Sequence, residues 1–126
     1  MNIVKAQEAA RTALGKYHYR DKCTVIQRRG VRDAKTKLTK QEEVTVLEDV
    51  PCKLSFETVK ITESSDTAAA LAQTTKLFLS PDHLVPPGSK IVVTHEGRQT
   101  AYKQSGEAAI YPSHQEIVVT LFKGWA

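Results

Sequence analysis

The sequence predicts a mainly β protein: a small antiparallel β-barrel or sandwich of six to eight strands with one N-terminal helix. Short β-branched segments alternate with turn signals roughly every 8–12 residues. Gly88, Gly97 and Gly106 are evenly spaced, as the hairpin turns of a meander would be. Helical periodicity of any length occurs only near the N-terminus. The 126 residues, 40% of them hydrophobic, fit a single domain over residues 1–126 that can bury its own core.

The predicted helix covers residues 1–17. Asn2 is a suitable N-cap, and Gly15 marks the C-terminal end. Charged side chains take one side of the helix. The apolar side recurs at three- and four-residue steps and consists of Ile3, Ala6, Ala10, Ala13, Leu14 and Tyr17.

Alternation of apolar and polar side chains predicts a strand over residues 22–29. Residues 30–41 carry no apolar periodicity, so we expect a loop or a long hairpin tip there. Alternation then resumes in three extended segments, which Pro51 interrupts: residues 42–49, 52–56 and 58–62.

The next segment, residues 63–75, is small, polar and alanine-rich. Two structures fit it. Asp66 could cap a short helix over residues 67–73, or the whole segment could be a mobile loop, because so short a helix is marginal without packing.

Short strands separated by turns make up the C-terminal half. The clearest pair is a hairpin around the Glu96-Gly97 turn. The last strand is the longest β-branched run. The strands expected here are residues 76–79, 91–95, 98–103, 108–111 and 115–122.

Two cysteines, Cys23 and Cys52, lie in predicted strands with no zinc-binding spacing. We expect small buried thiols in a reducing compartment. A disulfide would require the two strands to be neighbours.

The net charge of +4 is unevenly distributed. Residues 1–60 carry 13 Lys/Arg and 8 Asp/Glu, a net of +5, whereas the remaining residues carry 5 and 6, a net of −1. The excess lies in residues 28–40, the candidate basic loop, and consists of Arg28, Arg29, Arg32, Lys35, Lys37 and Lys40. Three interpretations stay open: a solvated loop, a contact with an acidic protein, or a contact with nucleic acid. The run has no aromatic residue to stack a base.

No constellation of residues predicts an enzyme or a cofactor. The four histidines are scattered, and there is no nucleophile elbow, metal-binding spacing or phosphate-binding glycine pattern. Trp125 either packs against the β core or contacts a neighbouring subunit. No apolar run is long enough to span a membrane and no secretion signal is visible, so we expect an intracellular protein.

Several turn-and-strand motifs resemble the head-closure proteins of tailed phages, also called head-completion, stopper or head–tail joining proteins. The version carried by PBSX-like defective prophages of Bacillus is the most similar in pattern. The motifs are Tyr-Arg-Asp-Lys-Cys-Thr-Val-Ile (19–26), Val-Pro-Cys-Lys-Leu-Ser (50–55), Lys-Leu-Phe-Leu-Ser-Pro-Asp (76–82), Pro-Pro-Gly-Ser-Lys-Ile-Val-Val (86–93) and Tyr-Pro-Ser-His-Gln-Glu-Ile (111–117).

This resemblance implies a small β-barrel that assembles as a ring beneath the portal and adaptor. The ring would close the DNA tunnel and provide the docking surface for the tail-completion protein. An isolated subunit would be a monomer or a weak oligomer, assembly would take place in the host cytoplasm, and the final position would be the neck of the particle. By position, the flexible segment 57–75 corresponds to a loop that closes the tunnel in some relatives. Its candidate residues are Glu63, Ser64, Ser65, Asp66 and Thr67.

Overall fold

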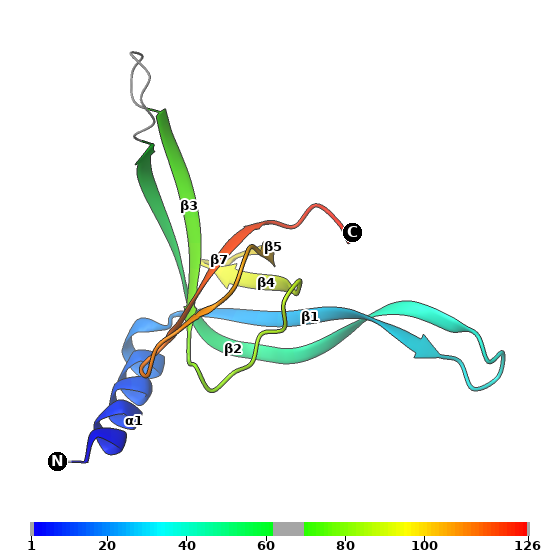
Figure 1. Cartoon of the computed structure of the whole chain (residues 1–126), viewed down its shortest axis with the longest axis horizontal. Helices are drawn as coiled ribbons and strands as arrows, with labels where there is room; N and C mark the ends of the chain where they lie inside the picture. Colours follow the sequence, from blue (N-terminus) through cyan, green and yellow to red (C-terminus); the bar gives the residue numbers. More distant parts are fainter. Residues whose placement is uncertain (1, 62–69, 126) are drawn as a thin grey trace.

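The computed structural model describes residues 2–61 and 70–125. One α-helix, α1 (Ile3–Ala13), continues as a π-helical turn, η1 (Leu14–His18), and seven strands follow (Figure 1). The strands are β1 (Asp21–Arg32), β2 (Thr39–Ile61), β3 (Ala70–Leu79), β4 (Lys90–His95), β5 (Arg98–Gln104), β6 (Ala109–Ile110) and β7 (Gln115–Leu121).

All seven strands belong to one antiparallel sheet that closes on itself. Their order is β3-β2-β1-β4-β5-β7-β6, and β3 also pairs with β7. Six strands therefore form a continuous circuit, and β6 is a short addition to β7. The prediction of a mainly β fold with six to eight strands and one N-terminal helix is confirmed.

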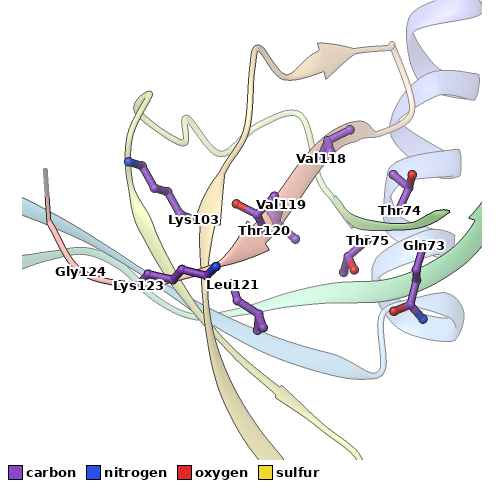
Figure 2. A pocket seen from close by; sticks show the side chains of 10 residues that line it. All are labelled: Gln73, Thr74, Thr75, Lys103, Val118, Val119, Thr120, Leu121, Lys123 and Gly124. Carbon is purple, nitrogen blue, oxygen red and sulfur yellow. The ribbon is translucent and has the colours of Figure 1, made fainter.

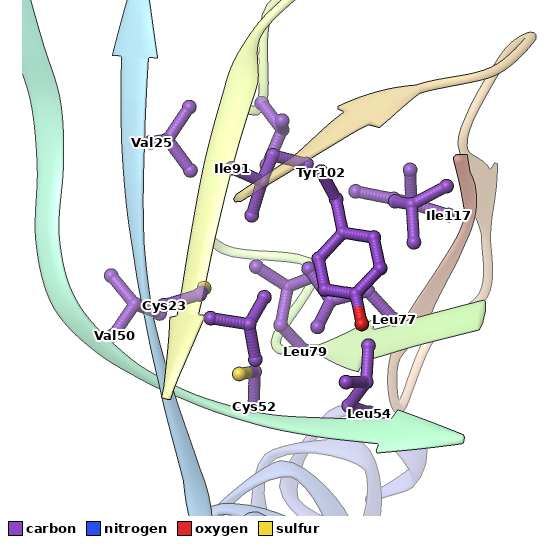
Figure 3. Close-up of a cluster of buried hydrophobic side chains, with 13 residues drawn as sticks. Cys23, Val25, Val50, Cys52, Leu54, Leu77, Leu79, Ile91, Tyr102 and Ile117 are labelled. Carbon is purple, nitrogen blue, oxygen red and sulfur yellow. The ribbon is translucent and has the colours of Figure 1, made fainter. Parts of the chain in front are cut away.

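The core lies inside this circuit, because the six strands of the circuit direct apolar side chains to its interior. In β4, Ile91 and Val93 are buried, and in β7, Ile117 and Val119 are buried, while the residues between them are more exposed. Figure 3 shows side chains from β1, β2, β3, β4, β5 and β7 converging. The buried cluster is Cys23, Val25, Val50, Cys52, Leu54, Leu77, Leu79, Val85, Ile91, Val93, Tyr102, Ile117 and Val119.

Strand β2 has 23 residues and belongs to two hairpins. Its first part pairs with β1, and its second part, from Cys52 onward, pairs with β3. Register shifts in the β1–β2 pairing lie near Asp49, whose φ is 48°. Both hairpins extend beyond the core as arms that point in different directions (Figure 1).

Pro51 does not end a strand, contrary to expectation. It lies opposite Lys22 within the β1–β2 pairing, so the three predicted segments belong to one strand from residue 42 to residue 61. Proline lacks only the backbone donor, and its fixed φ is compatible with extended structure.

Residues 30–41 form a long hairpin tip, which is one of the two predicted alternatives, and not a loop. The paired strands continue through Arg32 and resume at Thr39, leaving only residues 33–38 as the turn. The Asp33 side chain accepts a hydrogen bond from the Lys35 backbone N–H, 2.9 Å long. No apolar alternation marks these residues because both faces of the arm are exposed.

The segment 57–75 is also more regular than predicted. Residues 57–61 pair with residues 70–74. The described part of the segment is therefore a strand pair, and neither the predicted mobile loop nor the predicted short helix fits it. The candidate tunnel residues Glu63, Ser64, Ser65, Asp66 and Thr67 lie outside the described residues.

Helix α1 buries no residue of its own. The Asn2 side chain accepts from the Val4 backbone N–H at 3.0 Å, as its predicted role as N-cap requires. Gly15 does not end the helix but lies within the π-helical turn, which runs to His18. Among the described residues, no helix is long and apolar enough to cross a membrane.

Candidate interaction surface

The distal part of the β1–β2 hairpin, residues 28–43, is here called the basic arm. All six predicted basic residues lie on it, and all are exposed. Arg28, Arg29 and Arg32 come from β1, and Lys40 comes from β2. Lys35 and Lys37 occupy the turn, where Lys37 has a φ of 58°. The structure therefore brings all six residues onto one element.

The positive charge of the basic arm is concentrated at its tip. At the base, Arg28 lies opposite Glu43, and Arg29 lies opposite Glu42. Directly opposed side chains share a face of the sheet, so these charges offset each other. Glu43 also forms an ion pair with Lys90, in which the Glu43 Oε2 atom lies 3.3 Å from the Lys90 Nζ atom.

The tip carries four basic side chains against Asp33 alone, a net of +3 over residues 30–41. Two apolar side chains accompany them. Leu38 is 63% exposed and Val31 is 39% exposed. Basic and apolar side chains are therefore exposed together at the tip.

A close approach of the two strands fixes the middle of the arm. A Cβ on Gly30 would lie 2.9 Å from the Thr39 Cγ2 atom, which real Cβ atoms do not tolerate without a shift. At the base, the Gln27 side chain donates to the hydroxyl of Ser89, which is fully buried. The contact between Gln27 and Ser89 therefore connects the base of the arm to the core.

Trp125 is half-buried and packs edge-on against Phe122, with ring centroids 5.2 Å apart. Its indole Nε1 is buried without a hydrogen-bond partner among the described residues. The ammonium group of Lys90 lies 4.9 Å from the Phe122 ring centroid. The tail thus folds onto its own chain beside the basic arm, and a groove there is lined by Gln27, Arg28, Gln41, Gly88, Lys103 and Trp125.

The structure brings two histidines beside carboxylates. His95 Nδ1 lies 2.9 Å from Asp21 Oδ1, and the other oxygen of Asp21 accepts from the Leu54 backbone N–H at 2.9 Å. His114 Nε2 lies 3.1 Å from Glu116 Oε1. These contacts join neighbouring segments of the fold. No group of three or more metal-ligating side chains occurs in the described part of the chain.

Both cysteines are buried and free, as expected for small core side chains. Their strands are neighbours, since Cys23 lies opposite Val50 and Cys52 lies opposite Asp21. A hydrogen bond with the Cys23 thiol, followed by burial, raises the pKa of the Cys52 thiol far above its usual value. Its thiolate form is therefore disfavoured in the folded protein.

A second surface was not foreseen from the sequence. Between β3 and β7 lies an open groove of about 650 Å³, where these two strands separate (Figure 2). Its existence depends on the pairing of segments about 40 residues apart, and no local motif signals such a pairing.

No known protein family and no curated protein matches this sequence. Among solved structures, the chain is similar to the phage-like element PBSX protein xkdH of Bacillus subtilis. The TM-score is 0.47 with 12% identity, over 79% of this chain and 91% of that chain. A TM-score below 0.5 at this identity does not establish a common fold.

Proposed function

We propose that this protein is a structural head–tail connector subunit of a phage-like particle. In this proposal it has no catalytic role or cofactor, assembles in the host cytoplasm and occupies the particle neck. Copies form a ring under the portal and adaptor proteins, close the DNA tunnel and present a docking surface to the tail-completion protein.

The observation that carries the proposal is the pair of hairpin arms projecting from a small closed core (Figure 1). Beyond Ile26, β1 pairs only with β2 among the described residues. Before Thr75, β3 also pairs only with β2 among these residues. Each arm therefore has a free strand edge. Exposed strand edges are aggregation-prone in an isolated protein and are normally covered. A neighbouring subunit would cover the exposed edge of β1 in a ring.

The motifs that resemble head-closure proteins also support this proposal, because two of them contact each other. The Gln115 side chain donates to the backbone oxygens of Ser80 and His83, at 2.8 and 2.6 Å. His114 stacks on Tyr111, with ring centroids 4.8 Å apart. These residues fix the end of β3 against the start of β7, and the proposal gives them a structural role.

The test is assembly with the portal–adaptor complex of the same phage-like particle. We expect co-sedimentation and a ring-shaped density below the adaptor in electron micrographs. Charge reversal at the arm tip, K35E/K37E, should weaken this association at least tenfold, whereas the matched reversal K5E/K22E should not. Absence of association at every salt concentration would refute the proposal.

The exposed tip favours one alternative, a small basic nucleic-acid-binding protein. In that case DNA binding should weaken steeply with salt, because each neutralised phosphate contributes about −0.9 to the logarithmic slope. Replacing Arg32 and Lys40 by Gln should then reduce the slope by about 2. Binding that is insensitive to these changes would exclude the basic arm as the DNA contact.

A further inference from the structure

The groove in Figure 2 arises where β3 and β7 separate. Pairing between them runs from Leu79–Gln115 to Thr75–Val119 and then stops. Beyond that point β3 continues along β2, whereas β7 continues along β5 through Leu121. The two strands thus open into a wedge.

The wall formed by β3 has an unpaired edge. Residues 70–74 pair with β2 on one side and have no strand partner on the other among the described residues. The facing edge of β7 at Thr120 is similarly free, since Thr120 pairs only with β5. Backbone N–H and C=O groups along such edges are ready to pair with an extended peptide.

The walls also carry side chains suited to a strand. Leu121 is 59% exposed and Val118 is 37% exposed, so apolar surface is available for alternate side chains of a bound peptide. The groove is lined by Gln73, Thr74, Thr75, Lys103, Val118, Val119, Thr120, Leu121, Lys123 and Gly124.

The charge of the groove has one sign. Lys103 and Lys123 are the charged residues of the lining, and no carboxylate occurs among the lining residues that the structure describes. Neither lysine has an ion-pair partner within the described chain. A ligand with carboxylates is therefore complementary to this surface.

We propose that this groove binds an extended acidic segment of a partner protein. The segment adds as a strand to the free edge of β3 and places its carboxylates near Lys103 and Lys123. This binding does not depend on the proposed ring. A nucleic acid fits less well, because it cannot use the backbone edge and the described lining offers no aromatic ring to stack a base.

The experiment selects decapeptides from a random library displayed on a carrier, with the full-length protein immobilised. We expect enrichment of Asp and Glu alternating with β-branched residues. The variant K103E/K123E should lose this preference, and so should K123E alone, whose exposed side chain lies outside every strand. The variant K5E/K22E, changed at exposed lysines away from the groove, should keep it.

The selected peptide, once synthesised, should slow backbone amide exchange within residues 70–74. Proline at alternate positions of the peptide should weaken binding at least tenfold, because proline donates no backbone hydrogen bond. Failure of acidic sequences to enrich, equal enrichment on K103E/K123E, or displacement of the peptide by a ten-nucleotide oligothymidylate would each overturn the proposal. A loss of peptide binding as the protein self-associates would also overturn the proposal, because a second copy of the chain would then occupy the groove.

Discussion

Leu77 lies where three strands meet. Its backbone is opposite Leu54 of β2 on one side and Ile117 of β7 on the other, and its side chain is fully buried. The side chain therefore fills the interior at the pairing that closes the sheet (Figure 3). Because protein interiors are close-packed, a void there is not repaired by small movements.

Replacing Leu77 by Ala should lower the free energy of unfolding by about 2–5 kcal/mol, as large-to-small core substitutions do. Leu84, which is 79% exposed, provides the matched control, and L84A should change stability by less than about 0.5 kcal/mol. Urea denaturation followed by circular dichroism measures both. Equal effects of the two variants would show that the closed core is misassigned.

Tyr19 presents a buried polar group without a partner. The residue is 7% exposed, and its hydroxyl makes no hydrogen bond among the described residues. Burial, the larger cause, and the nearby Cys52 thiol raise the pKa of Tyr19 above its ordinary value of 10.0. The folded state therefore holds this proton more tightly than the unfolded state.

It follows that stability should fall as the pH rises through the unfolded-state pKa of about 10, and should continue to fall until the folded-state pKa is reached. Tyr19→Phe removes this contribution, so its stability should depend less on pH above 10. Near pH 7, Y19F should be neutral or stabilising, because no hydrogen bond is lost. Urea titrations at pH 7 and at pH 10.5 provide the comparison, and an identical pH dependence in both proteins would contradict it.

At the scale of elements, helix α1 is held by polar contacts rather than by burial. Arg11 donates from Nε to the Pro112 backbone oxygen at 2.6 Å and from Nη1 to Asp82 at 3.0 Å. Its guanidinium thus joins the helix to the turns after β3 and β6. Because the Asp82 side chain is 64% exposed, solvent screens the ion pair, and its own contribution to stability is small.

Arg11→Ala should therefore detach the helix without unfolding the sheet. We expect faster amide exchange throughout residues 3–13 and a loss of global stability of about 1 kcal/mol or less. Lys5→Ala changes an exposed residue of the same helix and serves as control. Unchanged exchange in R11A would show that another contact holds the helix.

The elements also show how far the sequence pattern reached. Where one face is buried, as in β4 and β7, alternation located the strands to within one or two residues. Where both faces are exposed, as in the basic arm, alternation is absent, and the sequence left a loop and a long hairpin tip as alternatives for residues 30–41. Backbone pairing alone keeps those residues extended. Such pairing does not require alternating apolar and polar side chains, so the sequence pattern does not reveal it.

On the scale of the whole molecule, the core and the arms are separable. None of the thirteen core residues lies between residues 28 and 43. The closed sheet can therefore fold without the basic arm. Since Gln27 lies opposite Val44, a two-residue turn can join them in the shortened protein.

Replacing residues 28–43 by Asn-Gly should lower the free energy of unfolding by no more than about 2 kcal/mol, because only exposed pairs and the Glu43–Lys90 contact are lost. Association with the portal–adaptor complex should disappear. Thermal unfolding and co-sedimentation separate the two effects. A shortened protein that folds and still assembles would remove the arm from the proposed interface.

The sequence by itself determined the fold class, the N-terminal helix, most of the strands and the residues that carry the positive charge. These features follow from local patterning, namely side-chain alternation, turn residues and charge. Only the tertiary structure decided that the sheet closes through β3 and β7, that the basic stretch is a paired arm whose charge remains at the tip, and that a groove opens where β3 and β7 diverge. Each of these depends on pairing between segments distant in the chain, and backbone hydrogen bonds, which are the same for nearly every residue, do not encode their partners in local sequence.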